Sequence, residues 1–212
     1  MHRLSLVQKF SLLLLAALSL FGFALGKIIT SAMHQNMINR SNELAANFLI
    51  YEIKSKLDVE DLHTPKYGDE FKDLSRQIES LNLGPDVMNI KVWNRDFTVV
   101  WASNEDEVGK QSPGHHELEE VYEGELISEI ASGHHLQEKY TYAVAAREVM
   151  ELYIPVRFGP DDAVKLVFEV YRNIDFLLAE IRHHNRIIWG STALGTALLY
   201  LILFGLVWGA SR

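Results

Sequence analysis

The sequence contains no cysteine. This absence excludes disulfide bonds, metal sites with thiolate ligands and catalysis by a thiol nucleophile. A Gly-rich phosphate loop is also missing, and no nucleophile accompanies the acidic runs at residues 105–107 and 117–120. A catalytic carboxyl pair needs two differently tuned groups facing one cleft, so adjacent glutamates of this kind indicate a solvated face. We therefore expect no enzyme activity in this chain and no cofactor.

Charged residues are missing from two apolar runs, FSLLLLAALSLFGFALG at residues 10–26 and IIWGSTALGTALLYLILFGLVWGAS at residues 187–211. A hydrocarbon core about 30 Å thick needs about 20 helical residues, with a usual range of about 17–25. Both runs meet this requirement, the first at its lower limit. They predict transmembrane helices over residues 10–27 and 187–209.

The first run also has features of a cleaved signal peptide. A basic start precedes it, and the small residues of Ala24-Leu25-Gly26 close it. Apolar character continues past Lys27 at Ile28 and Ile29, which favours a retained anchor. Cleavage stays open as the alternative.

The segment between the two runs is strongly acidic. All 28 Asp and Glu residues lie within residues 28–186, and of the 20 Lys and Arg residues only Arg3, Lys9, Lys27 and Arg212 lie outside it. A nucleic-acid surface would need a basic patch, so no nucleic-acid partner is expected. Basic residues flank both sides of the predicted spans, and the positive-inside rule therefore does not choose an orientation.

The helix pattern is continuous near both ends of the central segment. Residues 31–57 contain neither Pro nor Gly and place apolar residues at helical spacing, which predicts one long helix leaving the membrane. A second helix is expected over residues 69–83, before Gly84-Pro85, and a short one within residues 115–125. Residues 173–186 predict a last helix that continues into the second span without a breaker.

Strand patterns fill the rest of the segment. Residues 90–101 predict a hairpin that turns at Arg95 and Asp96, so that Val92 faces Val99 and Ile90 faces Trp101. Further strands are expected at residues 126–132, 149–157 and 164–171. In the last of these, Val164, Leu166, Phe168 and Val170 share one face and Lys165, Val167, Glu169 and Tyr171 share the other. The result is an α+β fold, a small antiparallel sheet with one face covered by helices.

These stretches resemble a known family. IKVWNRDFTVVWASNEDEVGKQ, HHELEEVYEGE, MELYIPVRFG and LVFEVYRNIDFLL are similar to the extracytoplasmic PAS-like sensor domains of the PDC or single-Cache class. Such domains lie between two membrane helices in bacterial sensor histidine kinases, diguanylate cyclases and chemoreceptors. The resemblance covers residues 28–186. One departure concerns the hairpin turn, because Phe97 follows Asp96 where the family usually has Gly.

The resemblance implies an organisation and a function. Residues 1–9 would be cytoplasmic, residues 28–186 a periplasmic or extracellular PAS-like sensor domain, and residues 210–212 the start of a cytoplasmic region of a multi-pass protein of the cell (inner) membrane. The chain would be a homodimeric sensory input module that detects a small molecule and signals to a cytoplasmic output, most simply a histidine kinase. That output, whether kinase or cyclase, would lie beyond residue 212 or on a partner. The alternative is a two-span structural protein whose central domain docks another envelope component.

The predicted ligand site is the polar face of the sheet. A small ligand needs an apolar cup with a few convergent polar groups, and Arg suits a carboxylate. In the resembled family the ligand usually lies over this sheet. The residues that could project there, with Lys91 beside them, are Trp93, Arg147, Tyr153, Glu169 and Tyr171.

Two other patterns bear on function. His115-His116, His134-His135 and His183-His184 are adjacent pairs, whereas metal ligands on one element usually stand three or four residues apart, so no metal site is predicted and exposed loop histidines are expected for the first two pairs. The third pair suits a membrane interface. Each span also carries a GxxxG spacing that allows close helix approach, formed by Gly22 and Gly26 and by Gly205 and Gly209.

Overall fold

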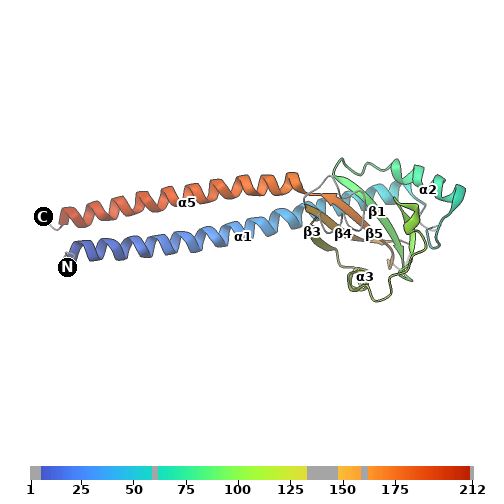
Figure 1. The fold of residues 1–212 in the computed structure, drawn as a ribbon, viewed down its shortest axis with the longest axis horizontal. Coiled ribbons are helices and arrows are strands. Elements are labelled where there is room, and N and C mark those ends of the chain that lie inside the picture. Colours follow the sequence, from blue (N-terminus) through green and yellow to red (C-terminus); the bar gives the residue numbers. More distant parts are fainter. Residues whose placement is uncertain (1–5, 59–61, 133–147, 159–161, 211–212) are drawn as a thin grey trace. The chain divides into compact units, whose positions relative to one another are not determined.

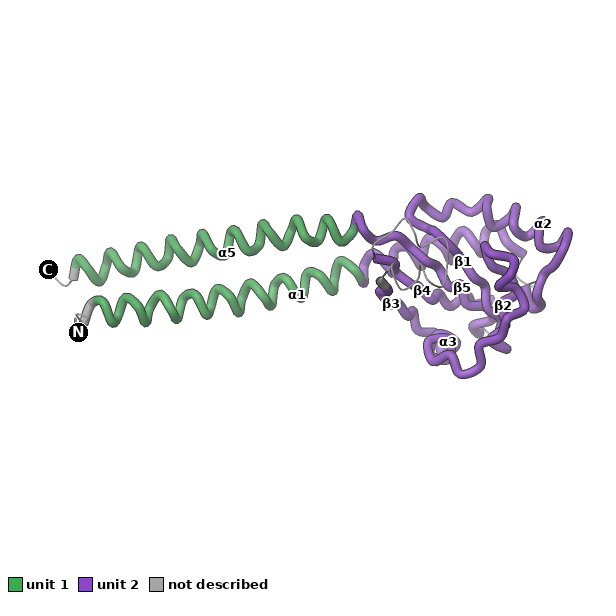
Figure 2. Tube along the Cα trace, viewed as in Figure 1, with its two compact units in different colours: residues 1–38, 177–212 green, residues 39–176 purple. Residues whose placement is uncertain are grey.

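The computed structural model describes residues 6–58, 62–132, 148–158 and 162–210. The chain divides into two compact units (Figure 2). Unit 1 comprises residues 1–38 and 177–212, and unit 2 comprises residues 39–176. Figure 1 labels the helices and strands.

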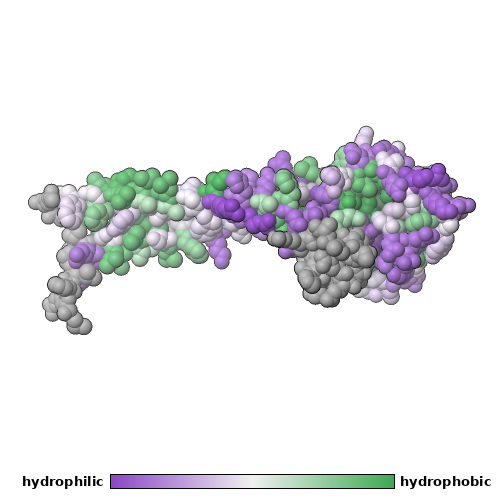
Figure 3. Space-filling view, turned by 45° about the horizontal axis from the view of Figure 1, so that its top comes forward, coloured by the Kyte–Doolittle hydropathy of each residue, from purple (hydrophilic) through white to green (hydrophobic). Residues whose placement is uncertain are grey.

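Unit 1 contains the apolar parts of two long helices. Helix α1 runs over Leu6–Lys56 and helix α5 over Asp175–Ala210, each without interruption. Both are long and apolar enough to cross a membrane. Large apolar side chains are exposed along them, among them those of Leu13, Leu20 and Leu206. Figure 3 shows the hydrophobic surface of these helices in green. Exposed apolar surface of this extent is unfavourable in water and favourable in lipid, which fits the predicted spans.

The two glycine pairs differ in their surroundings within unit 1. A Cβ at Gly22 would lie 2.7 Å from Oγ1 of Thr196, and one at Gly26 would lie 3.0 Å from the ring of Trp189. These glycines of α1 therefore admit α5 side chains. At Gly205 and Gly209, apart from the chain neighbours and the backbone of α5 itself, no described atom lies within 4 Å of an added Cβ.

Unit 2 is built on a five-stranded antiparallel sheet. Its strands are β1 (Val87–Asn94), β2 (Val99–Ala102), β3 (Ile127–Ser132), β4 (Glu148–Arg157) and β5 (Val164–Asn173). Their order across the sheet is β2-β1-β5-β4-β3. Residues 39–56 of α1, helix α2 (Gly68–Glu79), the short helix η2 (Glu105–Glu107) and helix α3 (His116–Tyr122) complete the unit. The predicted α+β class and element order are confirmed.

Apolar side chains on both faces of the sheet are covered by helices. On one face, Phe168 and Leu152 pack in a cluster with Ile53 of α1 and Ile78 of α2. Alternate residues of the same strands, such as Tyr153 and Val167, pack on the other face with Leu118 and Val121 of α3. The sequence predicts one face covered by helices, as α1 and α2 cover it. Helix α3 also packs on the second face, where it buries Leu118 and Val121 completely.

Three local predictions were wrong. In the hairpin, Val92 pairs with Trp101 and Trp93 with Val99, which leaves Val100 as an extra residue in a β-bulge. The pairing of β4 with β5 is also irregular after Val156. Val164 was predicted on the same face as Leu166, but it packs instead in the cluster that contains Tyr153. Helix α2 ends at Glu79 rather than at residue 83. The hydroxyl of the next residue, Ser80, donates to the carbonyl of Gln77 and competes with the backbone hydrogen bonds that would continue the helix.

Candidate functional site

A cavity of about 460 Å³ lies over the sheet face that α3 partly covers. Its floor comes from β1, β4 and β5, and the segment from η2 to the start of α3 adds Glu107, Lys110 and His115. Four of the five predicted ligand residues line it together with Lys91, namely Trp93, Tyr153, Glu169 and Tyr171. The fifth, Arg147, lies outside the described residues.

Strand register explains why these residues converge. Glu169 of β5 pairs with Lys91 of β1 on one side and with Tyr153 of β4 on the other. Side chains directly opposite in an antiparallel pair point to the same face with Cβ atoms about 4.5–5.5 Å apart. Glu169 therefore lies at the centre of the cavity floor.

The Glu169 carboxylate is buried and fully engaged. Its side chain is 2% exposed, Trp93 Nε1 donates to Oε2 over 2.6 Å, and the Tyr171 hydroxyl donates to Oε1. Lys91 Nζ lies 3.6 Å from the same Oε1. A buried charge is tolerated only when it is paired and hydrogen-bonded, and this carboxylate meets both conditions.

A second carboxylate contacts Lys91 from the loop after β2. Glu107 Oε2 lies 3.5 Å from Lys91 Nζ, and Lys110 Nζ donates to Glu107 Oε1 over 2.6 Å. Burial acts to raise the pKa of Glu107, but the hydrogen bond from Lys110 and the charges of both lysines outweigh it and hold the pKa below its usual value. Glu107 is thus ionised and bridges the two lysines.

Backbone hydrogen bonds hold this loop against β2. The N–H of Val99 donates to the carbonyl of Lys110 over 2.9 Å, and the N–H of Gly109 donates to the carbonyl of Val99 over 2.8 Å. Gly109 has a φ of +83°, a conformation that a residue with a Cβ rarely adopts. The glycine therefore allows the chain to turn back and bring Glu107 over the sheet.

Among the carboxyl groups that line the cavity, that of Glu151 has the fewest hydrogen-bond and ion-pair partners in the described part of the chain. Burial, followed by the negative charge of Glu169, raises the pKa of Glu151. Among the described residues its only hydrogen bond comes from the Tyr153 hydroxyl, over 3.4 Å. Burial and the neighbouring carboxylates also raise the pKa of Tyr153, so its hydroxyl stays protonated as a donor. Glu151 can therefore accept a further partner.

His115 also reaches the cavity. Its ring makes edge contacts with Trp93 and Tyr153, at centroid distances of 6.0 and 5.7 Å. Nε2 lies 3.2 Å from Glu117 Oε2, whereas Nδ1 is buried and has no hydrogen-bond partner in the described part of the chain. The expectation of an exposed loop histidine was wrong for His115, because α3 begins directly after it and packs on the sheet.

The other predicted features are located as follows. His116 and His183 are exposed, His184 is partly exposed, and His134-His135 lie outside the described residues. Over the described ranges, no group of three potential metal ligands comes together. Glu151 and His115 were absent from the predicted site, although alternation with Tyr153 could have identified Glu151 on the same face of β4.

No protein-family model matches the chain, and no curated protein matches it. The class is therefore defined by the structure itself. It is an α+β protein with a five-stranded antiparallel sheet, a long N-terminal helix and two long apolar terminal helices.

Proposed function

We propose that the chain is a membrane-anchored sensory input module of the PAS-like, single-Cache kind. It detects a small molecule in the cavity over Glu169, outside the cytoplasmic membrane, and passes the signal through its terminal helices to a cytoplasmic histidine kinase output. The observation that carries the proposal is the cavity itself, in which charged and aromatic side chains from three strands converge. Pockets of about 300–1,000 Å³ with a few convergent polar groups are typical of small-molecule sites.

The described charges of the cavity favour a ligand with a protonated amine. Glu107 and Glu169 already face Lys91, whereas no lysine or arginine of the described residues forms an ion pair with Glu151. An ammonium group placed there would stabilise the ionised carboxylate. The unpartnered Nδ1 of His115 offers a second hydrogen-bonding point.

Residues 28–186 would then lie outside the cytoplasmic membrane, with the apolar parts of α1 and α5 in the lipid bilayer. The two long apolar helices and the central α+β unit support this arrangement. Dimerisation, which the resemblance implies, would use the bundle of terminal helices. In that case the glycines at positions 205 and 209, which have no described side chain within 4 Å of an added Cβ, are available for a second copy.

The proposed function predicts that a small amine stabilises the purified full chain in lipid nanodiscs. A suitable panel contains the common amino acids, ethanolamine, histamine and putrescine, with acetate and succinate as comparators. At 100 times its dissociation constant, a ligand adds about 2.7 kcal/mol to the free energy of unfolding. In a chain of this size that shifts the melting temperature by roughly 5–11 °C.

The stabilisation should depend on pH in a defined direction. The pKa of Glu151 is raised in the free protein, and a bound ammonium group lowers it, so binding favours the ionised form. Stabilisation is therefore complete above the free-state pKa of Glu151 and is lost as pH falls through the lower pKa of the complex. Glu151→Gln should remove the stabilisation, whereas Glu119→Gln, an exposed charge removal on α3, should leave it unchanged. An amine effect that survives in Glu151→Gln, or stabilisation by the acids alone, would contradict the proposal.

A further inference from the structure

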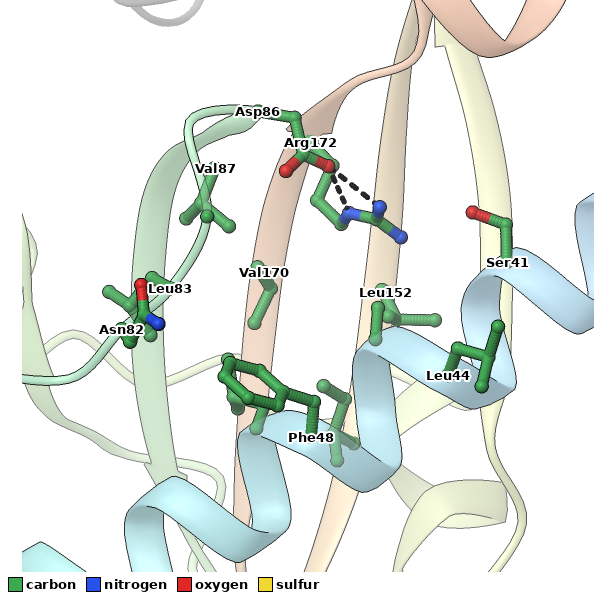
Figure 4. Close-up of a pocket in the computed structure, with 14 residues that line it drawn as sticks. Ser41, Leu44, Phe48, Asn82, Leu83, Asp86, Val87, Leu152, Val170 and Arg172 are labelled. Atoms are coloured by element: carbon green, nitrogen blue, oxygen red, sulfur yellow. Dashed lines mark hydrogen bonds and ion pairs between the residues drawn. The ribbon is translucent and has the colours of Figure 1, made fainter.

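A second cavity, of about 390 Å³, lies on the opposite face of the sheet within unit 2. Figure 4 shows it between the second half of α1, the segment that leads into β1, and strands β4 and β5. Leu44 and Phe48 of α1 form one wall, and Leu152 and Val170 form the floor. The lining is mainly apolar, and its polar side chains are those of Ser41, Asn82, Asp86 and Arg172.

Asp86 and Arg172 form an ion pair in the lining of this cavity. Arg172 Nε and Nη2 lie 2.7 and 2.6 Å from the same oxygen, Asp86 Oδ2. The third nitrogen, Nη1, is buried and has no hydrogen-bond partner among the described residues. Figure 4 shows it pointing away from Asp86, on the side of Leu152 and Ser41. A charged donor without a described partner is therefore present in a mainly apolar cavity.

Such a donor is unfavourable unless an acceptor meets it. A buried polar group without a partner loses its hydration and gains nothing in return, and the loss is larger for a charged group. The Arg172 side chain is 14% exposed and Asp86 is 34% exposed, so water screens the aspartate more than the guanidinium. The cavity thus presents one unsatisfied positive donor and a hydrophobic wall.

We infer that this cavity binds a small monocarboxylate with an apolar tail, of the class of short-chain fatty acids. One carboxylate oxygen accepts from Arg172 Nη1, and the tail packs between α1 and the floor residues Leu152 and Val170. Charge-assisted hydrogen bonds to guanidinium are stronger than neutral ones, which favours an acid over an alcohol of the same length. The cavity volume lies within the usual range for small ligands.

The inference does not depend on the site over Glu169. Successive residues of a strand point to opposite faces, so Leu152 and Ile154 line this cavity while Glu151 and Tyr153 line the other. The two sites differ in charge, since this cavity has one Arg172 nitrogen without a partner among the described residues, whereas the cavity over Glu169 contains the weakly supported carboxyl of Glu151. Each can therefore be tested without the other.

Saturation-transfer NMR with hexanoate and the full chain in lipid nanodiscs tests the inference, with empty nanodiscs as the background. Hexanoate should give a saturable signal. 1-Hexanol and hexylamine should bind at least about tenfold more weakly, because hexanol carries no negative charge to pair with the guanidinium and protonated hexylamine is repelled by it. Arg172→Gln should weaken hexanoate binding by at least about tenfold. Asp86→Asn removes the competing carboxylate and should strengthen it.

Two further variants keep the test valid if Arg172→Gln fails to fold. Ala45→Phe fills the cavity without touching Asp86 or Arg172 and should abolish hexanoate binding, whereas Asn47→Phe, on an exposed position of α1 outside the cavity lining, should not change it. No signal above empty nanodiscs, equal binding of hexanol, unchanged binding in Ala45→Phe, or weaker binding in Asp86→Asn would each overturn the inference.

Discussion

Replacing Glu169 by alanine is expected to lower the free energy of unfolding by about 3 kcal/mol, which is the lower end of the range for breaking a buried ion pair by removing one partner. The substitution removes the carboxylate that faces Lys91, which is 4% exposed, and it removes the acceptor of Trp93 Nε1, while the Tyr171 hydroxyl of β5 still lies 3.2 Å from Lys91 Nζ. Glu107 still contacts Lys91, which keeps the loss from being larger. Chemical denaturation of the full chain in nanodiscs, followed by tryptophan fluorescence, measures the change.

Two comparisons separate this effect from a general loss of packing. The double variant Glu169→Leu with Lys91→Met removes both charges and should cost clearly less than the sum of the two single changes, because no uncompensated charge remains. Glu70→Ala removes an exposed carboxylate whose side chain is 75% exposed, and it should change stability by less than about 0.5 kcal/mol. If Glu169→Ala cost no more than Glu70→Ala, the buried network would not be a stabilising centre of the sheet.

Inserting one alanine after Glu180 is expected to change the output of a reporter kinase fused after Arg212 strongly, and four inserted alanines should largely restore it. Helix α5 is unbroken over Asp175–Ala210, so a change at the end of β5 reaches the span through continuous helix. Each added residue rotates the following part of the helix by about 100° and advances it by about 1.5 Å. After four inserted residues, nearly the same face of the helix points in its original direction.

The expected dependence on insertion length distinguishes signalling from simple attachment. A helix that acts only as a tether would give the same output for every number of inserted residues. Ile181 is buried in unit 1, and Leu177 and Leu178 precede it at helical spacing, so the face that rotates is an apolar one. Output that stays constant from zero to four insertions would exclude transmission through α5.

The strands that line the cavity could be predicted, because the alternation of apolar and polar residues along a strand has a physical cause. Burying one face of a strand requires apolar residues at every second position, and this pattern placed Trp93, Tyr153, Glu169 and Tyr171 on one face before any pairing was known. The structure brings these four side chains to one cavity. Length and absence of charge likewise predicted the two long apolar helices.

The hairpin register could not be predicted from the same pattern. Asn94 Oδ1 accepts from the N–H groups of both Asp96 and Thr98, over 3.1 and 3.0 Å, and this side chain sets a wider turn than the two residues assumed. Phe97 adopts a φ of +53° there, a left-handed conformation that favours glycine. A one-residue bulge then shifts the pairing of β2 with β1. The pattern of residues in β2 does not predict this shift.

Loop residues of the site had no periodic signal either. Glu107 and Lys110 come to the cavity because backbone pairing with Val99 folds their loop over the sheet. His115 comes there because α3 starts beside it and buries Leu118. Both depend on contacts between distant segments, which a single sequence does not encode as a local pattern.

The most direct test of the proposed sensor is the output of the kinase fusion as a function of added amine, compared among the native chain, Glu151→Gln and the control Glu119→Gln. The amine to use is the one that stabilises the full chain most strongly. The account predicts that output changes over the same concentrations at which the amine stabilises the protein, that Glu119→Gln responds as the native chain does, and that Glu151→Gln no longer responds. An identical response in Glu151→Gln, or an amine that stabilises the native chain without changing output, would contradict the account.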